Sequence, residues 1–175
     1  DTDTTAVRKP FFAPVAGGSC GGTAVRGVPK PTQNKAPTPP PDGALVLSSP
    51  GDSFPGFANK ATAFVAVDSF LAKDMRLHQK EGVKFMYQAV MGLRKSAHTN
   101  QTHHGCLLAH EMGMGKTLQV IALLWTLLKQ SPVGGGITSP IADKVVIITP
   151  ASLVQNWGLE IKKWLGTTRL EPLLV

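Results

Sequence analysis

The chain has 175 residues and a formal net charge of +7, from 18 Lys and Arg against 11 Asp and Glu, with two cysteines. Two cysteines offer no disulfide framework, and the longest strongly apolar run, residues 118–128, is shorter than the roughly 20 residues that span a bilayer. We therefore expect a soluble intracellular protein with no membrane partner, and the positive charge is compatible with phosphate-rich partners.

Residues 1–56 are predicted to form a mostly disordered tail rich in proline and glycine. Ten of the 14 prolines fall within the first 55 residues, and a stretch such as "PTQNKAPTPPPDG" has almost no apolar residues at helical or strand spacing. The entropy lost on ordering such a segment would not be offset by burial. Since the chain starts with Asp1 and ends on the apolar run "LEPLLV", we expect it to be a piece of a longer protein.

The spacing of apolar residues predicts the first elements of a folded part over residues 57–175. Residues 64–70 alternate as an extended segment does. An amphipathic helix is predicted from about 78 to 91, where Gly92 ends it. A polar loop then leads to "GCLLA", residues 105–109, a short buried strand candidate.

A glycine-rich turn connects this strand to an almost wholly apolar helix over residues 116–130, as expected for a crossover helix in a parallel sheet. The β-branched run at 144–149 predicts a central parallel strand, and a helix over 152–165 with Ser152 as a plausible N-cap follows. The order is strand, helix, strand, helix, probable strand. This order predicts an α/β fold with a parallel sheet and right-handed crossovers.

The turn itself, "HEMGMGKT" at residues 110–117, resembles a phosphate-binding loop. In the pattern G-x-x-x-x-G-K-[ST], glycines let backbone N–H groups surround the phosphates, lysine reaches the β/γ oxygens and the hydroxyl holds Mg²⁺. Gly115, Lys116 and Thr117 match, but His110 occupies the first glycine position. A lysine in a first helical turn is unfavourable to the helix dipole unless an anion offsets it. An ordinary glycine turn is the alternative interpretation.

Three ordered segments resemble the SWI/SNF-type DNA translocases of helicase superfamily two. "HEMGMGKTLQVIALLWTLL" resembles the family's D-E-M-G-L-G-K-T loop and helix, which also lacks the first glycine. "MRLHQKEGVKF" resembles L-R-x-H-Q-x-E-G-V, and "ITPASLVQNWGLEIKKWLG" resembles T-P-S-S-L-V-x-N-W. "LLWTLLKQSP", "KWLG" and "HGC" narrow the resemblance to the recombination-repair, RAD-fifty-four-like branch, and it runs from about Arg8 to Val175.

This resemblance implies the first part of a RecA-like P-loop lobe over residues 57–175 that binds ATP and Mg²⁺. Gln79 would read the adenine edge, Lys116 would neutralise phosphate charge, and Thr117 would hold Mg²⁺. The implied ATP-binding residues are Gln79, His110, Glu111, Met112, Gly113, Met114, Gly115, Lys116 and Thr117. The family has Asp where this chain has His110, and we expect ATP binding that is retained but weakened.

Contacts with the DNA backbone are implied for Thr149, Ser152 and Asn156, which follow the predicted strand end. Hydroxyls, amides and N–H groups at a helix start suit phosphate contacts that carry no sequence information. A helix cap and ordinary surface positions remain the alternative for each of them.

The resemblance implies a nuclear double-stranded DNA translocase that acts in homologous recombination and remodels chromatin, with the tail as a docking segment for a strand-exchange recombinase. Hydrolysis needs an acidic D-E-x-H motif, yet the chain has no adjacent acidic pair, and the family's second lobe is missing. The fragment alone is predicted to be inactive. The alternatives are a transcription-linked remodeler of the same superfamily and a truncated, non-catalytic partner-binding product.

Two further groups of residues invite other functions. A zinc site would use histidines and a cysteine whose spacing fits no common ligand pattern: His98, His103, His104, His110 and Cys106. Trp125, Trp157 and Trp164 could stack on bases, but their helical spacing among Leu and Ile favours core packing.

Overall fold

A computed structural model describes part of the chain, and all of its described residues belong to one of two units. The described ranges are 39–40, 42–55, 62–95, 104–133 and 140–175. The two units are Asp1–Thr32 and Gln33–Val175. Most of the predicted tail, residues 1–38, therefore lies outside the described residues, as do His98 and His103.

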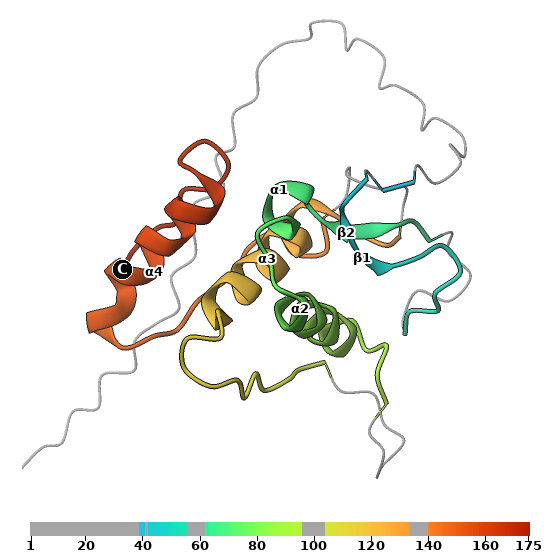
Figure 1. Cartoon of the computed structure of the whole chain (residues 1–175), viewed down its shortest axis with the longest axis horizontal. Helices are drawn as coiled ribbons and strands as arrows, with labels where there is room; N and C mark the ends of the chain where they lie inside the picture. The colour runs from blue at the N-terminus through green and yellow to red at the C-terminus, as the bar shows by residue number, and fades with distance from the viewer. Residues whose placement is uncertain (1–38, 41, 56–61, 96–103, 134–139) are drawn as a thin grey trace, which may run out of the picture. The chain divides into compact units, whose positions relative to one another are not determined.

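Two short strands, β1 (Leu45–Ser48) and β2 (Val65–Val67), pair in antiparallel orientation (Figure 1). Leu45 lies opposite Val67, and the register shifts between Val46 and Ser48. The extended segment predicted over 64–70 is thus confirmed for residues 65–67, but its last two residues, Ser69 and Phe70, begin a helix instead.

Strand β1 falls inside the segment predicted to be a disordered tail, so the folded part starts before residue 57. Leu47 is 3% exposed and Phe54 is 2% exposed, and both belong to the core. The proline-rich composition suggests that the entropy lost on ordering this segment is not compensated. Burial of these two large side chains offsets that loss. The predicted boundary between tail and folded part is corrected accordingly.

A short helix, α1 (Ser69–Ala72), follows β2, with the Asp68 side chain accepting a hydrogen bond from the Phe70 N–H. Helix α2 (Leu77–Val90) comes next and agrees with the helix predicted over 78–91. Gly92 has a φ of 68°, a left-handed conformation that glycine adopts without steric cost, so it ends the helix as predicted.

Helix α3 (Lys116–Lys129) confirms the predicted apolar helix, and more than half of its residues are buried. Its C-terminal end is attached to β2 by one side chain. Gln130 Nε2 donates to the Ala66 carbonyl at 2.8 Å, and Gln130 Oε1 accepts from the Ala66 N–H at 3.1 Å. This carboxamide supplies the two hydrogen bonds that a neighbouring strand would give, and the Ala63 N–H donates to the Pro132 carbonyl beside it at 2.7 Å.

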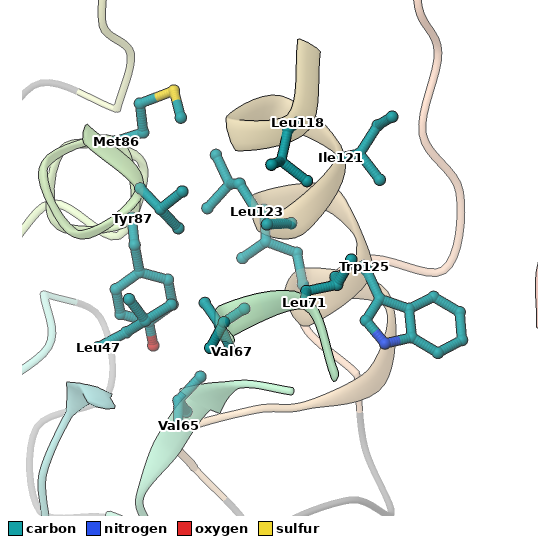
Figure 2. Close-up of a cluster of buried hydrophobic side chains, with 14 of the residues drawn as sticks. Leu47, Val65, Val67, Leu71, Met86, Tyr87, Leu118, Ile121, Leu123 and Trp125 are labelled. Atoms are coloured by element: carbon teal, nitrogen blue, oxygen red, sulfur yellow. The ribbon is translucent and has the colours of Figure 1, made fainter. Parts of the chain in front are cut away.

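The hydrophobic core lies between α2, α3 and the two strands. Figure 2 shows Met86 and Tyr87 of α2 on one side of the cluster and Leu118 and Leu123 of α3 on the other, with the Tyr87 ring beside Leu47 of β1. Tyr87 is fully buried, and its hydroxyl shares a 3.3 Å hydrogen bond with Ser48 Oγ of β1. Helices and strands thus close around one apolar cluster.

Helix α4 (Ala151–Leu165) contacts α3, and its Ile161 and Leu165 join the core. Pro150, rather than the predicted Ser152, occupies the N-cap position and makes no side-chain capping bond. Proline's fixed φ suits a helix start, so the N-cap lies two residues before the predicted Ser152 and α4 begins at Ala151.

The tryptophans pack against this core, as predicted. Trp125 is buried, while Trp157 and Trp164 are partly buried against the apolar cluster. Trp164 Nε1 also donates to Glu160 Oε2 at 2.9 Å. No helix of the described residues is long and apolar enough to cross a membrane.

The predicted parallel sheet is not found among the described residues, where segments 105–109 and 144–149 form no strand. Leu107 is 85% exposed, Val146 is 83% exposed and Ile148 is 94% exposed. A parallel ladder requires a second strand alongside, and an apolar run predicts burial without supplying that partner. The structure therefore confirms a mixture of helices and strands but not the parallel arrangement.

Candidate functional site

The loop over residues 110–115 owes its shape to two glycines. Gly113 has a φ of 81° and Gly115 has a φ of 75°, both in the left-handed region that other residues rarely adopt. Gly115 is the N-cap of α3, so the loop ends where the helix begins. The loop therefore approaches α3 at the end where free N–H groups and the positive end of the helix dipole lie.

Gly115 is also required by the close approach of Gln79 from α2. A Cβ atom built on Gly115 would collide with Gln79 Nε2. Gln79 Nε2 donates to the Met114 carbonyl at 3.2 Å, and its Oε1 accepts from the Arg76 N–H at 2.9 Å. One carboxamide thus stabilises the start of α2 and holds the loop against that helix.

The Lys116 side chain bends back over the loop. Its Nζ donates to the carbonyls of His110 and Glu111, each at 2.8 Å. The Met114 N–H donates to the same Glu111 carbonyl at 3.4 Å. Two carbonyl dipoles therefore offset the ammonium charge, which lies beside the loop at the first residue of α3.

The structure brings the predicted nucleotide residues together around the start of α3. Thr117 is the second residue of that helix and is half-buried, while Glu111 and Met112 are exposed on the loop. His110 is half-buried and faces α2 and α3, where its Nδ1 meets Gln119 Nε2 at 3.3 Å. The gathered set is Gln79, His110, Glu111, Met112, Gly113, Met114, Gly115, Lys116 and Thr117.

The three residues predicted to contact DNA lie elsewhere, at and just before the start of α4. Thr149 is half-buried, and Ser152 and Asn156 are exposed. Within the described residues, no hydrogen bond joins them to the loop over residues 110–115. They form a separate polar surface whose partner the geometry does not test.

The histidines considered for zinc are only partly described. His104 Nδ1 lies 3.2 Å from the Val90 carbonyl, beside Gly92 at the end of α2. In the described ranges, no three His, Cys, Asp or Glu side chains gather as metal ligands would.

Sequence reasoning overlooked His78 and Gln119, both of which touch the loop. His78 Nε2 lies 3.3 Å from the Met114 carbonyl, and Gln119 Nε2 lies 3.3 Å from the same oxygen. Gln119 could have been noticed, because it is a polar residue on a helix that is apolar on nearly every side.

Comparison with known proteins decides the family. The profile of the SNF2-related domain matches residues 78–175, which include α2, the loop, α3 and α4. The chain belongs to the SNF2 family. The resemblance that the three motifs indicated is thereby confirmed.

Curated SNF2-family relatives of this chain include several repair proteins. It is 45% identical over 139 residues to the DNA repair and recombination protein RAD54-like of Danio rerio, covering 77% of this chain and 18% of the relative. It is 49% identical over 111 residues to the DNA repair protein rhp54 of Schizosaccharomyces pombe, covering 63% of this chain and 12% of the relative. It is 40% identical over 157 residues to RAD54 of Saccharomyces cerevisiae, covering 71% and 17%. The chain therefore spans less than a fifth of these relatives' length.

Proposed function

We propose that the chain is the ATP-binding part of a translocase that moves on double-stranded DNA during homologous recombination repair. The observation that carries this proposal is the loop at the start of α3, where two left-handed glycines precede Lys116. Such a loop directs backbone N–H groups and the helix dipole at an anion, as the phosphates of ATP require. Membership of the SNF2 family and similarity to repair proteins support the choice of ATP and DNA.

Three residues around the loop have roles suited to their chemistry. Lys116 neutralises charge on the β/γ-phosphates once its ammonium leaves the two carbonyls, and the Thr117 hydroxyl is placed to hold Mg²⁺. Bound Mg²⁺ would supply electrostatic stabilisation of phosphate charge. Gln79 has one N–H and one lone pair beyond its two observed bonds, which suits an adenine edge.

DNA contact is proposed for the start of α4. Exposed Ser152 and Asn156, with Thr149 before them, present hydroxyl and amide groups that suit phosphate oxygens. The recombinase and chromatin are proposed partners, with docking by the part of the predicted tail, residues 1–56, that precedes β1, and the nucleus is the proposed location. These proposals rest on similarity to the repair proteins.

ATP hydrolysis is not expected from these 175 residues by themselves. Phosphoryl transfer to water needs carboxylates that hold the metal and orient the nucleophile, and the chain has no adjacent acidic pair. We expect the chain to bind ATP without hydrolysing it. An acidic metal-binding motif and a second lobe would be needed to complete the reaction.

Calorimetry with Mg²⁺-ATP tests the site through two lysines on the same helix. Lys116→Ala removes the ammonium at the loop and should weaken binding at least tenfold, the order expected for a lost charge-assisted contact. Lys129→Ala is the matched control, because Lys129 lies at the other end of α3 over the Trp125 ring. Equal affinities for wild type and Lys116→Ala would overturn the proposal and favour a non-catalytic, partner-binding protein.

A further inference from the structure

Gln119, the fourth residue of α3, is a fully buried polar side chain on an apolar helix. Its Oε1 has no hydrogen-bond partner in the described structure. Burying a polar atom without a partner is costly, so a carboxamide in this position requires an explanation. The explanation lies in the contacts of its Nε2 atom.

Gln119 Nε2 touches three residues of the phosphate loop. It lies 3.3 Å from His110 Nδ1, 3.3 Å from the Met114 carbonyl and 3.4 Å from the Gly115 carbonyl. An amide nitrogen only donates, so the imidazole Nδ1 and both carbonyls are the acceptors, and because the group has two N–H bonds for three acceptors, one N–H is shared between two of them. One buried group thereby connects the first residue of the loop to its last two.

The Met114 carbonyl is the centre of this network, because Gln79 Nε2 also donates to it at 3.2 Å. A planar trans peptide directs its C=O and N–H in opposite directions. With the Met114 carbonyl held toward α2, the Gly115 N–H must therefore point away from that helix. That N–H is one of the donors that a phosphate would use.

Space for the Gln119 carboxamide comes from Gly82 in the middle of α2. A Cβ atom on Gly82 would collide with Gln119 Oε1 and would lie 3.2 Å from Gln119 Cδ and 3.3 Å from His110 Cε1. Gly82 has no positive φ, so backbone conformation does not require glycine here. The close approach of the Gln119 carboxamide is what requires glycine at this position.

We propose that Gln119 is a positioning residue for the phosphate loop, and that Gly82 provides the space its amide occupies. Gln119 touches no nucleotide itself; it fixes the peptide whose N–H does. The inference rests on the proposed function for the identity of the ligand as ATP, but the loop geometry can be measured without nucleotide.

The test compares Gln119 in α3 with Gln130, the C-cap of the same helix, in the 175-residue chain. Gln119→Met keeps the length of the side chain and removes the donor. Gln130→Met is the matched control, because it removes two hydrogen bonds at the other end of α3, far from the loop in sequence. Steady-state ¹H–¹⁵N NOEs of the Gly113 and Gly115 amides report loop order, and calorimetry reports Mg²⁺-ATP affinity.

The proposal predicts that Gln119→Met lowers both glycine NOEs in the nucleotide-free chain and weakens Mg²⁺-ATP binding roughly tenfold. Gln130→Met should lower the unfolding midpoint while leaving the NOEs and the affinity unchanged. Unchanged NOEs in Gln119→Met, or equal effects of the two variants, would overturn the proposal. A wild-type chain that takes up no ATP would contradict the proposed function alone, because the NOEs would still decide the role of Gln119.

Two further variants keep the test decisive if Gln119→Met does not fold. Gln119→Glu keeps the shape but places an acceptor against two carbonyls, so it should lose loop order in the same way; wild-type NOEs would count against the proposal. Gly82→Ala should weaken Mg²⁺-ATP binding strongly beside Gln119 but far less in a Gln119→Ala background, where the collision with Oε1 is gone and only the 3.3 Å approach to His110 Cε1 remains. An equal effect of Gly82→Ala in both backgrounds would show that the two residues act independently.

Discussion

Replacing Gly115 by alanine forces two changes on the loop at once. The left-handed φ of 75° becomes strained for a residue with a Cβ, and that Cβ collides with Gln79 Nε2. Gly113→Ala imposes the first change without the second, because a Cβ on Gly113 meets no atom within 4 Å. The pair therefore separates backbone strain from loss of the contact with α2.

The magnitude follows from these two terms. Left-handed backbone costs an L-residue about 1–2 kcal/mol, and this is the whole cost expected for Gly113→Ala. In Gly115→Ala, the displaced Gln79 amide also loses its bonds to the Met114 carbonyl and the Arg76 N–H, each with a net contribution of about 0.5–1.5 kcal/mol. Gly115→Ala should therefore cost about 1–3 kcal/mol more than Gly113→Ala.

Urea unfolding followed by tryptophan fluorescence measures both free energies of unfolding. The gain from a less flexible unfolded chain is shared by the two variants and cancels in their difference. In a Gln79→Ala background the extra cost of Gly115→Ala should disappear. Equal costs for the two glycine variants in the wild-type background would refute this account of the Gln79 contact.

Three further predictions concern the core and the loop. Burial raises the pKa of Tyr87 from 10.0 to about 12, against a smaller lowering by the hydrogen bond with Ser48. The unfolded chain therefore loses this proton first, so the stabilisation is present below pH 10 and lost between pH 10 and 12. Over this interval the free energy of unfolding of Tyr87→Phe should fall less than that of wild type, by up to roughly 3 kcal/mol. Identical pH profiles of the two proteins in urea titrations would contradict this. His110→Asp should strengthen Mg²⁺-ATP binding a few-fold in calorimetry, because a carboxylate is a stronger acceptor for the Gln119 amide than an imidazole nitrogen; an unchanged Kd would contradict the expectation that His110 weakens binding. Ile121→Ala leaves a cavity at a residue 2% exposed and should cost about 2–5 kcal/mol, which a midpoint near that of wild type would disprove.

Helices were predictable from local sequence because their signals are local. The spacing of apolar residues gave α2 and α3 to within one residue at each end, and Gly92 stopped α2 where a left-handed residue was needed. The same local signals predict that Gly115, Lys116 and Thr117 lie at the start of α3, as the structure shows. Propensity and periodicity act over a few residues, so neighbours in sequence suffice.

Sheet pairing could not be predicted in this way. The apolar run at 144–149 was interpreted as a central parallel strand, yet Val146 and Ile148 are exposed, and the observed pairing joins β1 to β2 instead. A strand is defined by a partner that can lie anywhere in the sequence, and composition is silent about it. The boundary of the tail failed for a related reason, since Phe54 is buried by residues distant in the chain.

The network around the loop was also beyond sequence reasoning. A carboxamide that binds backbone carbonyls depends on how closely α2 and α3 approach each other, and the missing Cβ of Gly82 leaves room for Gln119 there. The glycine-rich turn before α3 could thus be located from the sequence, but the side chains that shape it could not be assigned.

The carboxamide of Gln130 gives α3 a mechanical property. The Gln130 carboxamide binds both the N–H and the carbonyl of Ala66, so two hydrogen bonds join β2 to the end of the helix in addition to apolar contact. If a change at the loop shifts α3 along its axis, either both hydrogen bonds must break or β2 must move with the helix. Through the antiparallel pairing, β1 would follow, so displacement at one end of the helix would reach the strands at the other.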